Sequence, residues 1–312
     1  MLNRRQILQL AAALPLLSGG TARAAAPVPA AAAATTDAVN TRPIPSSGEL
    51  LPVIGMGTSQ TFDVAASPEA LAELGAVLQA FFAAGGQVID SSPMYGEAES
   101  RVGDVLRSLS PRPPVFAATK VWTTGREEGI AQMQTSAQRM AVERFDLIAI
   151  HNLQDWRTHL ATLKQWKAEG KVRYIGITTS HGRNHEELLE IMRREPLDFV
   201  QFSYNLEDRV AEQALLPLAQ ERGIATMINR PYQRGSLFAK TRDQALPDVA
   251  GELGCSSWGQ FFLKWILGHP AVTSVIPATS KVHHMQDNMQ ANFGPLPDGR
   301  QRAEMMRAFT AL

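Results

Sequence analysis

Residues 145–177 read FDLIAIHNLQDWRTHLATLKQWKAEGKVRYIGI, and this stretch holds the pattern that decides the fold. The nearly unbroken apolar run at 145–150 is typical of a parallel strand that is covered on both faces. A helix-like segment follows at 156–169, and Gly170 is typical of the residue that ends a helix. A second apolar run comes at 172–177. Together these segments predict a strand–helix–strand unit.

The same unit recurs along the chain at a spacing of roughly 30 residues. A hairpin at 41–54 leads into the first strand, and further strands are expected at 87–90, 115–119, 199–202, 224–228 and 274–277. Helices are expected at 67–84, 97–108, 127–140, 184–195, 211–222, 256–267 and 282–292. Eight strands that alternate with helices predict an α/β fold, a (β/α)8 TIM barrel with an N-terminal β-hairpin. The rival is an open doubly wound sheet, but the first turn, GMGTSQ at 55–60, lacks the third glycine of a dinucleotide fingerprint.

Composition excludes several classes of protein. The 312 residues are 45% hydrophobic and 19% charged, which excludes intrinsic disorder. The net charge is zero, so nothing points to a nucleic-acid partner. Cys255 is the one cysteine, which excludes an internal disulfide and a cysteine zinc site. His283 and His284 are adjacent and would point apart on a helix, so we predict no metal site.

The N-terminal segment is predicted to lie outside the barrel domain, which we place at 41–312. Residues 1–24 are typical of an export signal: Arg4-Arg5 precede a short apolar run, and an A-x-A site ends at Ala24. The paired arginines favour the twin-arginine type and its export machinery, with an ordinary Sec signal as the alternative. The apolar run is too short to span a membrane, so no stable insertion is expected. Residues 25–40 form an Ala/Pro-rich linker. We therefore expect a periplasmic or otherwise exported protein, or a cytoplasmic one if the signal is not functional.

Polar side chains stand where consecutive strands end. Asp90, Lys120 and His151 follow one another at spacings of 30 and 31 residues, and Tyr95 lies on the loop after Asp90. Each alone has an ordinary structural explanation, but barrel chemistry sits at these strand ends. A nearby ammonium is expected to lower the pKa of a phenol from about 10 and make it a better acid. Tyr95 would then act as general acid and base, and a nicotinamide cofactor would carry the hydride.

Over about residues 43–293 the chain resembles the aldo-keto reductases. The segments that carry this resemblance are LPVIGMGT (51–58), IDSSPMYG (89–96), ATKVW (118–122), Ile150-His151, IGI (175–177), QFSYN (201–205) and the stretch from VIP (275–277) to Asn288. The resemblance implies a (β/α)8 barrel that binds NADP(H), rather than NAD(H), and interconverts carbonyls and alcohols. It also implies that Tyr95 is the general acid and base, that Asp90 and Lys120 tune it, and that His151 orients a small-molecule substrate.

Cofactor contacts are also carried over from the family. The positions concerned are Gly57, Thr58, Asp90, Thr178, Thr179, Gln201, Asn229, Arg230, Pro231, Gly235, Ser236, Leu237, Ala278, Thr279, Ser280, Lys281, His284, Asp287 and Asn288. Two departures stand out. The family's Ser-Asn after strand five is Thr178-Thr179 here, which loses an amide donor. The family's aromatic residue after strand seven is replaced by Asn229 or Arg230.

Substrate preference is weakly encoded. Trp122, Trp156 and Tyr232 follow strand ends and are predicted to line an apolar or aromatic substrate pocket. One alternative is a non-catalytic NADP(H)-binding module that senses redox state on the same barrel. A metal-dependent hydrolase is another alternative, but the strand ends carry no His-x-His pair or carboxylate cluster.

Overall fold

The computed structural model describes residues 38–312. Its main sheet has eight parallel strands, each paired with its neighbours in chain order. These strands are β3 (Met56–Gly57), β4 (Val88–Asp90), β5 (Phe116–Val121), β6 (Phe145–His151), β7 (Val172–Thr178), β8 (Phe199–Ser203), β9 (Ala225–Asn229) and β10 (Ser274–Val275). Two parallel bridges, Ile54 with Val275 and Gly57 with Ala278, join the first strand to the last. The predicted (β/α)8 barrel is therefore confirmed, and the export signal and most of the linker lie outside the described residues.

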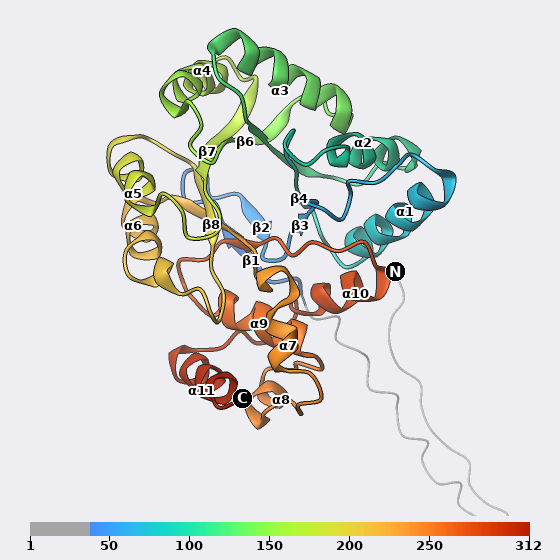
Figure 1. The fold of residues 1–312 in the computed structure, drawn as a ribbon, viewed down its shortest axis with the longest axis vertical. Helices are drawn as coiled ribbons and strands as arrows, with labels where there is room; N and C mark the ends of the chain where they lie inside the picture. Colours follow the sequence, from blue (N-terminus) through green and yellow to red (C-terminus); the bar gives the residue numbers. More distant parts are fainter. Residues whose placement is uncertain (1–37) are drawn as a thin grey trace, which may run out of the picture. The chain divides into compact units, whose positions relative to one another are not determined.

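Helices form a ring outside the strands (Figure 1). They are α1 (Pro68–Ala83), α2 (Ala98–Ser108), α3 (Arg126–Met140), α4 (Trp156–Ala168), α5 (His185–Arg194), α6 (Leu215–Arg222), α9 (Trp258–Leu267) and α10 (Val282–Gln290). The start of α1 shows why the sequence predicts these elements well. The Ser67 hydroxyl accepts the Ala70 N–H at 3.1 Å, and Pro68 occupies the first helical position.

Three helical features differ from the expectation. The segment 211–222 is split into a short 3-10 turn, η1 (Val210–Glu212), and α6, because Ala214 between them leaves the helical conformation. The excursion after β9 contains η2 (Gln233–Gly235), α7 (Leu237–Lys240) and α8 (Asp248–Glu252). A final helix, α11 (Gly299–Thr310), was not predicted, although Asp298 and Gln301 form a capping box at its start.

The N-terminal hairpin forms a separate antiparallel sheet of β1 (Thr41–Pro43) and β2 (Leu50–Pro52). Ile44 and Leu51 belong to the same buried cluster as Phe116, Tyr174 and Phe199, whose rings stack inside the barrel. Apolar side chains fill this end of the barrel. A polar site is therefore expected at the opposite end, where the carboxyl ends of the strands lie. Within residues 38–312 no helix is long and apolar enough to cross a bilayer.

Candidate active site

The carboxyl ends of the strands open into a cavity of about 1010 Å³. Asp90 ends β4, His151 ends β6 and Thr178 ends β7, while Gln201 lies within β8, and all four line this cavity. The strand register places His151 opposite Thr178, and Thr178 opposite Gln201. The barrel thus brings side chains that are far apart in sequence onto one polar floor.

An ion pair lies at the base of this cavity. The Lys120 ammonium is fully buried and donates to Asp90 Oδ2 at 2.7 Å and to the Ser91 carbonyl at 2.8 Å. Burial by itself lowers the pKa of Lys120, but attraction to Asp90 and Tyr95 outweighs it, so that the pKa lies above its ordinary value. Lys120 therefore stays charged, behind the wall of the cavity.

Tyr95 stands on the loop after β4, where its N–H donates to the Ser92 carbonyl at 3.0 Å. The Lys120 ammonium lies 5.1 Å from the centre of its ring. Burial raises the pKa of Tyr95 above 10, and the positive charge of Lys120 opposes that rise without overcoming it. The sequence-based expectation of a lowered phenol pKa is therefore wrong for the protein without its ligands, because desolvation penalises the phenolate more than Lys120 stabilises it.

His151 faces Tyr95 edge-on, with 5.6 Å between ring centres. Its Nδ1 lies 2.8 Å from the Ser92 hydroxyl oxygen. Burial, helped by the charge of Lys120, lowers the pKa of His151 to about 3. The imidazole is consequently neutral at physiological pH and can donate or accept a hydrogen bond but carries no charge.

The amide of Gln201 is already held by its neighbours. Its Oε1 accepts the Thr178 hydroxyl at 3.0 Å, and its Nε2 donates to Asp90 Oδ1 at 3.1 Å. Asn229 is held likewise, since it donates to the Thr179 carbonyl at 3.0 Å and accepts the Ser203 hydroxyl at 2.7 Å. These bonds extend the Asp90–Lys120 pair into a continuous polar network across β4, β7, β8 and β9.

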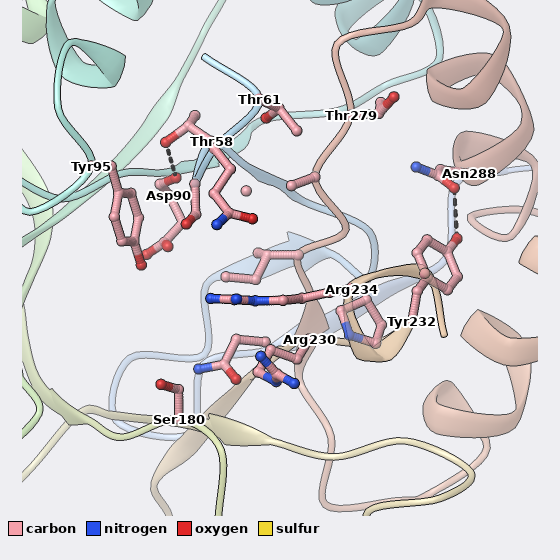
Figure 2. Close-up of a pocket in the computed structure, with 18 of the residues that line it drawn as sticks. Thr58, Thr61, Asp90, Tyr95, Ser180, Arg230, Tyr232, Arg234, Thr279 and Asn288 are labelled. Atoms are coloured by element: carbon pink, nitrogen blue, oxygen red, sulfur yellow. Dashed lines mark hydrogen bonds between the residues drawn. The ribbon is translucent and has the colours of Figure 1, made fainter. Parts of the chain in front are cut away.

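Most of the predicted cofactor positions do line the cavity, as Figure 2 shows for several of them. The lining includes Gly57, Thr58, Asp90, Thr178, Gln201, Asn229, Arg230, Pro231, Gly235, Ala278, Thr279, His284, Asp287 and Asn288. Five other predicted positions lie outside the lining: Thr179, Ser236, Leu237, Ser280 and Lys281. Leu237 is fully buried in the core, and Lys281 is an exposed side chain 3.6 Å from Glu73.

Of the three residues predicted to line an aromatic substrate pocket, two lie outside the cavity lining. Trp122 and Trp156 do not line the cavity. The main chain of Trp122 bonds to the Gln132 amide on α3, and the Trp156 indole donates to Glu187 at 2.9 Å. The Trp156 ring is therefore held against α5, and the Trp122 side chain is partly exposed.

Tyr232 does line the cavity, but its hydroxyl donates to Asn288 at 2.6 Å. This bond is drawn in Figure 2, on the opposite side of the view from Tyr95. Tyr232 thus lies beside Asn288, one of the residues predicted to bind cofactor, and away from Tyr95.

Several cavity residues were missed by the sequence reasoning, among them Gln60, Thr61, Met94, His181 and Arg234. Met94 lies within the IDSSPMYG segment but was given no role, and the others stand outside the strand ends and the quoted motifs. Arg234 and His181 adopt left-handed backbone conformations, with φ of 56° and 62°, which no sequence pattern signals.

The cavity has features that suit a polar, extended ligand. The Thr61 hydroxyl and Arg230 Nε are buried with no hydrogen-bond partner among the described residues. Within the same residues, neither Arg230 nor Arg234 forms an ion pair with a carboxylate, although Arg230 Nη1 contacts His181 and its Nη2 donates to Gln233 at 2.9 Å. Both residues therefore bring positive charge to the cavity lining. Gly57 allows two main-chain segments to approach closely at the rim, because a Cβ at this position would lie 2.9 Å from the Ile276 carbonyl oxygen. Residues 38–312 hold no group of three or more His, Cys, Asp or Glu that could bind a metal ion.

Comparison with known proteins agrees with this geometry. The family model "Aldo/keto reductase family" matches residues 53–303. Methylglyoxal reductase YeaE of Escherichia coli is 28% identical over 250 residues, covering 78% of this chain and 86% of that protein. An aldo/keto reductase of Klebsiella pneumoniae, solved with NADP and acetate, superposes with a TM-score of 0.68 at 24% identity and covers 84% of this chain and 93% of that one. An aldo-keto reductase of Bacillus halodurans, at 18% identity, gives a TM-score of 0.70 over 87% of this chain and 96% of its own. The matched segment spans the barrel strands and includes Asp90, Lys120 and His151. The chain therefore belongs to the aldo/keto reductase family.

Proposed function

We propose that this protein is an NADP(H)-dependent oxidoreductase that interconverts the carbonyl of an aldehyde, ketone or sugar with the corresponding alcohol. The observation that carries the proposal is the buried Asp90–Lys120 pair beside Tyr95, at the wall of a cavity large enough for a cofactor and a small substrate. Asp90 keeps the ammonium charged and in place, and the ammonium faces the phenol that would move the proton.

The raised pKa of Tyr95 suits the reductive direction. A phenol whose pKa lies above 10 stays protonated at neutral pH, so its proton is available for the oxygen of the substrate carbonyl. When that proton leaves, the phenolate is stabilised by the ammonium of Lys120. In the oxidative direction the same phenolate would take the proton of the alcohol. The neutral imidazole of His151 would donate a hydrogen bond to the substrate oxygen and orient it.

The cavity residues fit a nicotinamide dinucleotide. Arg230 and Arg234 offer charge for its phosphates, and the rim from Thr279 to Asn288 offers polar groups for its adenosine end. When bound, NADPH supplies the hydride and NADP⁺ accepts it. The Klebsiella structures with NADP and NADPH support the phosphorylated cofactor, whereas an E. coli relative is named an NADH-specific methylglyoxal reductase. His284 lines the cavity and is the candidate for the 2′-phosphate, since Lys281 lies outside the lining.

Small aldehydes are the first substrates to test, because two E. coli relatives are named methylglyoxal reductases. Met94 is 44% exposed and lines the cavity beside Tyr95, where it offers an apolar contact to the substrate. NADPH oxidation would be followed by absorbance with methylglyoxal and with an aromatic aldehyde. Tyr95→Phe is expected to reduce turnover roughly 10³-fold, while fluorescence titration shows NADPH affinity unchanged.

Two outcomes would change this proposal. A wild-type protein that binds NADPH but reduces no carbonyl would favour the non-catalytic binding module. A rate loss below about 10-fold in Tyr95→Phe would assign proton transfer to another group.

We also propose that residues 1–24 direct export by the twin-arginine route, supported by Arg4-Arg5, the short apolar run and the site ending at Ala24. The full chain expressed in a bacterium should then be found, shortened, in the periplasmic fraction. Replacing both arginines with lysine should retain it in the cytoplasm. Unchanged export of that variant would favour a Sec signal.

A further inference from the structure

Ser92 is a fully buried serine whose side chain the proposed reaction leaves without a role. Its hydroxyl oxygen lies 2.8 Å from Nδ1 of His151. Since His151 lines the cavity and its Nδ1 is engaged by Ser92, the nitrogen that remains for a substrate is Nε2. The chemistry of His151 therefore depends on which of the two nitrogens carries the proton.

Two arrangements of hydrogens are compatible with this contact. In the first, the Ser92 O–H donates to a bare Nδ1, and the imidazole proton is on Nε2. In the second, Nδ1–H donates to the Ser92 oxygen, and Nε2 is bare. Only the first leaves His151 able to donate a hydrogen bond into the cavity.

A further contact of Ser92 decides between them. Its hydroxyl oxygen already accepts the Met94 N–H at 3.2 Å. Within residues 38–312 this oxygen has two hydrogen-bond partners, Met94 N and His151 Nδ1, and Ser92 is shielded from solvent. In the second arrangement the serine would accept from both partners and its own hydrogen would have no acceptor, which is costly in a buried site. In the first arrangement the Ser92 hydrogen is paired with Nδ1, and the serine oxygen keeps the Met94 N–H.

The surroundings also keep the imidazole neutral, which is the condition for having one tautomer at all. Among the described residues, Lys120 is the charged group that acts on the pKa of His151, and the Tyr95 ring faces the imidazole edge-on. The ammonium of Lys120, itself paired with Asp90, disfavours a second positive charge nearby. Ser92 therefore acts on a ring that has a single N–H to place.

We propose that Ser92 is a positioning residue that donates its hydroxyl proton to Nδ1 and so holds the proton of His151 on Nε2, facing the carbonyl oxygen of the substrate. The catalytic part of this inference rests on the proposed function. The main chain of the same residue accepts the N–H of Tyr95 at 3.0 Å. Ser92 thus sets both the turn that carries the proton donor and the tautomer of the group that orients the substrate.

Nuclear magnetic resonance of the protein itself tests the tautomer without any variant of Ser92. The full chain, labelled with ¹⁵N-histidine and free of cofactor, should show His151 near neutral pH with a protonated Nε2 and a bare Nδ1. The resonances are assigned by their loss in His151→Gln. A protonated Nδ1 in the wild-type protein would overturn the inference.

Substitutions then test the consequence. In Ser92→Ala we expect the ¹⁵N shifts of His151 to move towards a mixture of tautomers, and kcat for carbonyl reduction to fall roughly 10- to 100-fold. This is less than the roughly 10⁴-fold loss seen when a catalytic histidine is held in the wrong tautomer. The fluorescence-titrated affinity for NADPH should change less than about twofold, because Ser92 does not line the cavity. Ser92→Thr, which keeps the hydroxyl, should restore the wild-type spectrum.

Ser91→Ala is the matched control, since Ser91 is equally buried and its hydroxyl contacts Thr58 at 2.9 Å instead of His151. It should leave the His151 resonances in place. An unchanged tautomer and unchanged kcat in Ser92→Ala would overturn the inference. If the wild-type protein shows the expected tautomer but reduces no carbonyl, the proposed function fails and the assignment of hydrogens stands.

Discussion

Lys120→Met removes the ammonium that lies 5.1 Å from the centre of the Tyr95 ring. With the ring centre taken as the position of the phenolate charge, a unit charge at this separation stabilises it by about 3 kcal/mol at an effective dielectric constant of about 20. The Asp90 carboxylate, 2.7 Å from the ammonium, offsets part of this attraction. We therefore expect a net loss of about 2–3 kcal/mol in the transition state, which lowers kcat roughly 30- to 200-fold.

The same substitution also destabilises the fold. It leaves the Asp90 carboxylate buried with the Gln201 amide as its remaining side-chain partner, and removing one member of a buried ion pair costs about 3–5 kcal/mol. The double variant Asp90→Asn/Lys120→Met removes both charges. It should recover most of the free energy of unfolding while its kcat stays low, because the phenolate still lacks its counter-charge.

Three measurements separate the two effects: denaturant-induced unfolding, NADPH oxidation with methylglyoxal, and fluorescence titration with NADPH. Lys120 does not line the cavity, so NADPH affinity should be nearly unchanged in Lys120→Met; the double variant also alters Asp90, which does line it, so its NADPH affinity is measured separately and kcat is compared at saturating NADPH. If the double variant regained wild-type kcat together with its stability, the rate loss would be structural. The electrostatic role assigned to Lys120 would then be refuted.

Three further predictions concern titration, backbone and substrate contact. Because the pKa of His151 is lowered to about 3, the pH profile of kcat/KM for reduction should show no imidazole inflection between about pH 5 and 8. The rate should fall only above pH 10, as Tyr95 loses its proton; an inflection near neutrality that disappears in His151→Gln would contradict this. Gly57→Ala would place its Cβ 2.9 Å from the Ile276 carbonyl oxygen at the seam of the barrel, so calorimetry should show a lower Tm, and an unchanged Tm would mean that the seam can relax. Met94→Ala should raise KM for the aldehyde several-fold with NADPH affinity unchanged, and equal KM values would remove Met94 from the substrate contact.

Helix starts and strand interiors could be predicted from the sequence because local chemistry specifies them. Ser67 caps its helix with its own hydroxyl, and the apolar run at 145–150 can only be satisfied by burial on both faces. The capping box of Asp298 and Gln301 was equally local, and α11 could have been predicted from it. The break at Ala214 was also signalled locally, because Pro217 in the first turn of α6 has no N–H for the Gln213 carbonyl and its ring would clash with that carbonyl in a continuous helix.

The pKa of Tyr95 shows a limit of such local signals. From the sequence, a lysine one strand away indicates a nearby positive charge, and that charge is present. The opposing effect is the loss of water around the phenol, which depends on how completely the surrounding loops close over it. Proximity can be inferred from spacing, whereas the degree of burial is a property of the whole packed structure, so the sign of the shift was beyond sequence reasoning.

The same distinction explains which site residues could be found. Asp90, His151, Thr178 and Gln201 are carried by strands, where side chains alternate between two faces and the register of parallel neighbours is set by the barrel. Their position in the sequence therefore determines the face on which they lie. A loop has no such periodicity: Arg234 reaches the cavity through a left-handed residue conformation that its neighbours in space stabilise. It follows that the strands fix the positions of Asp90, Lys120 and His151, whereas loops place Tyr95 and cavity residues such as Arg234.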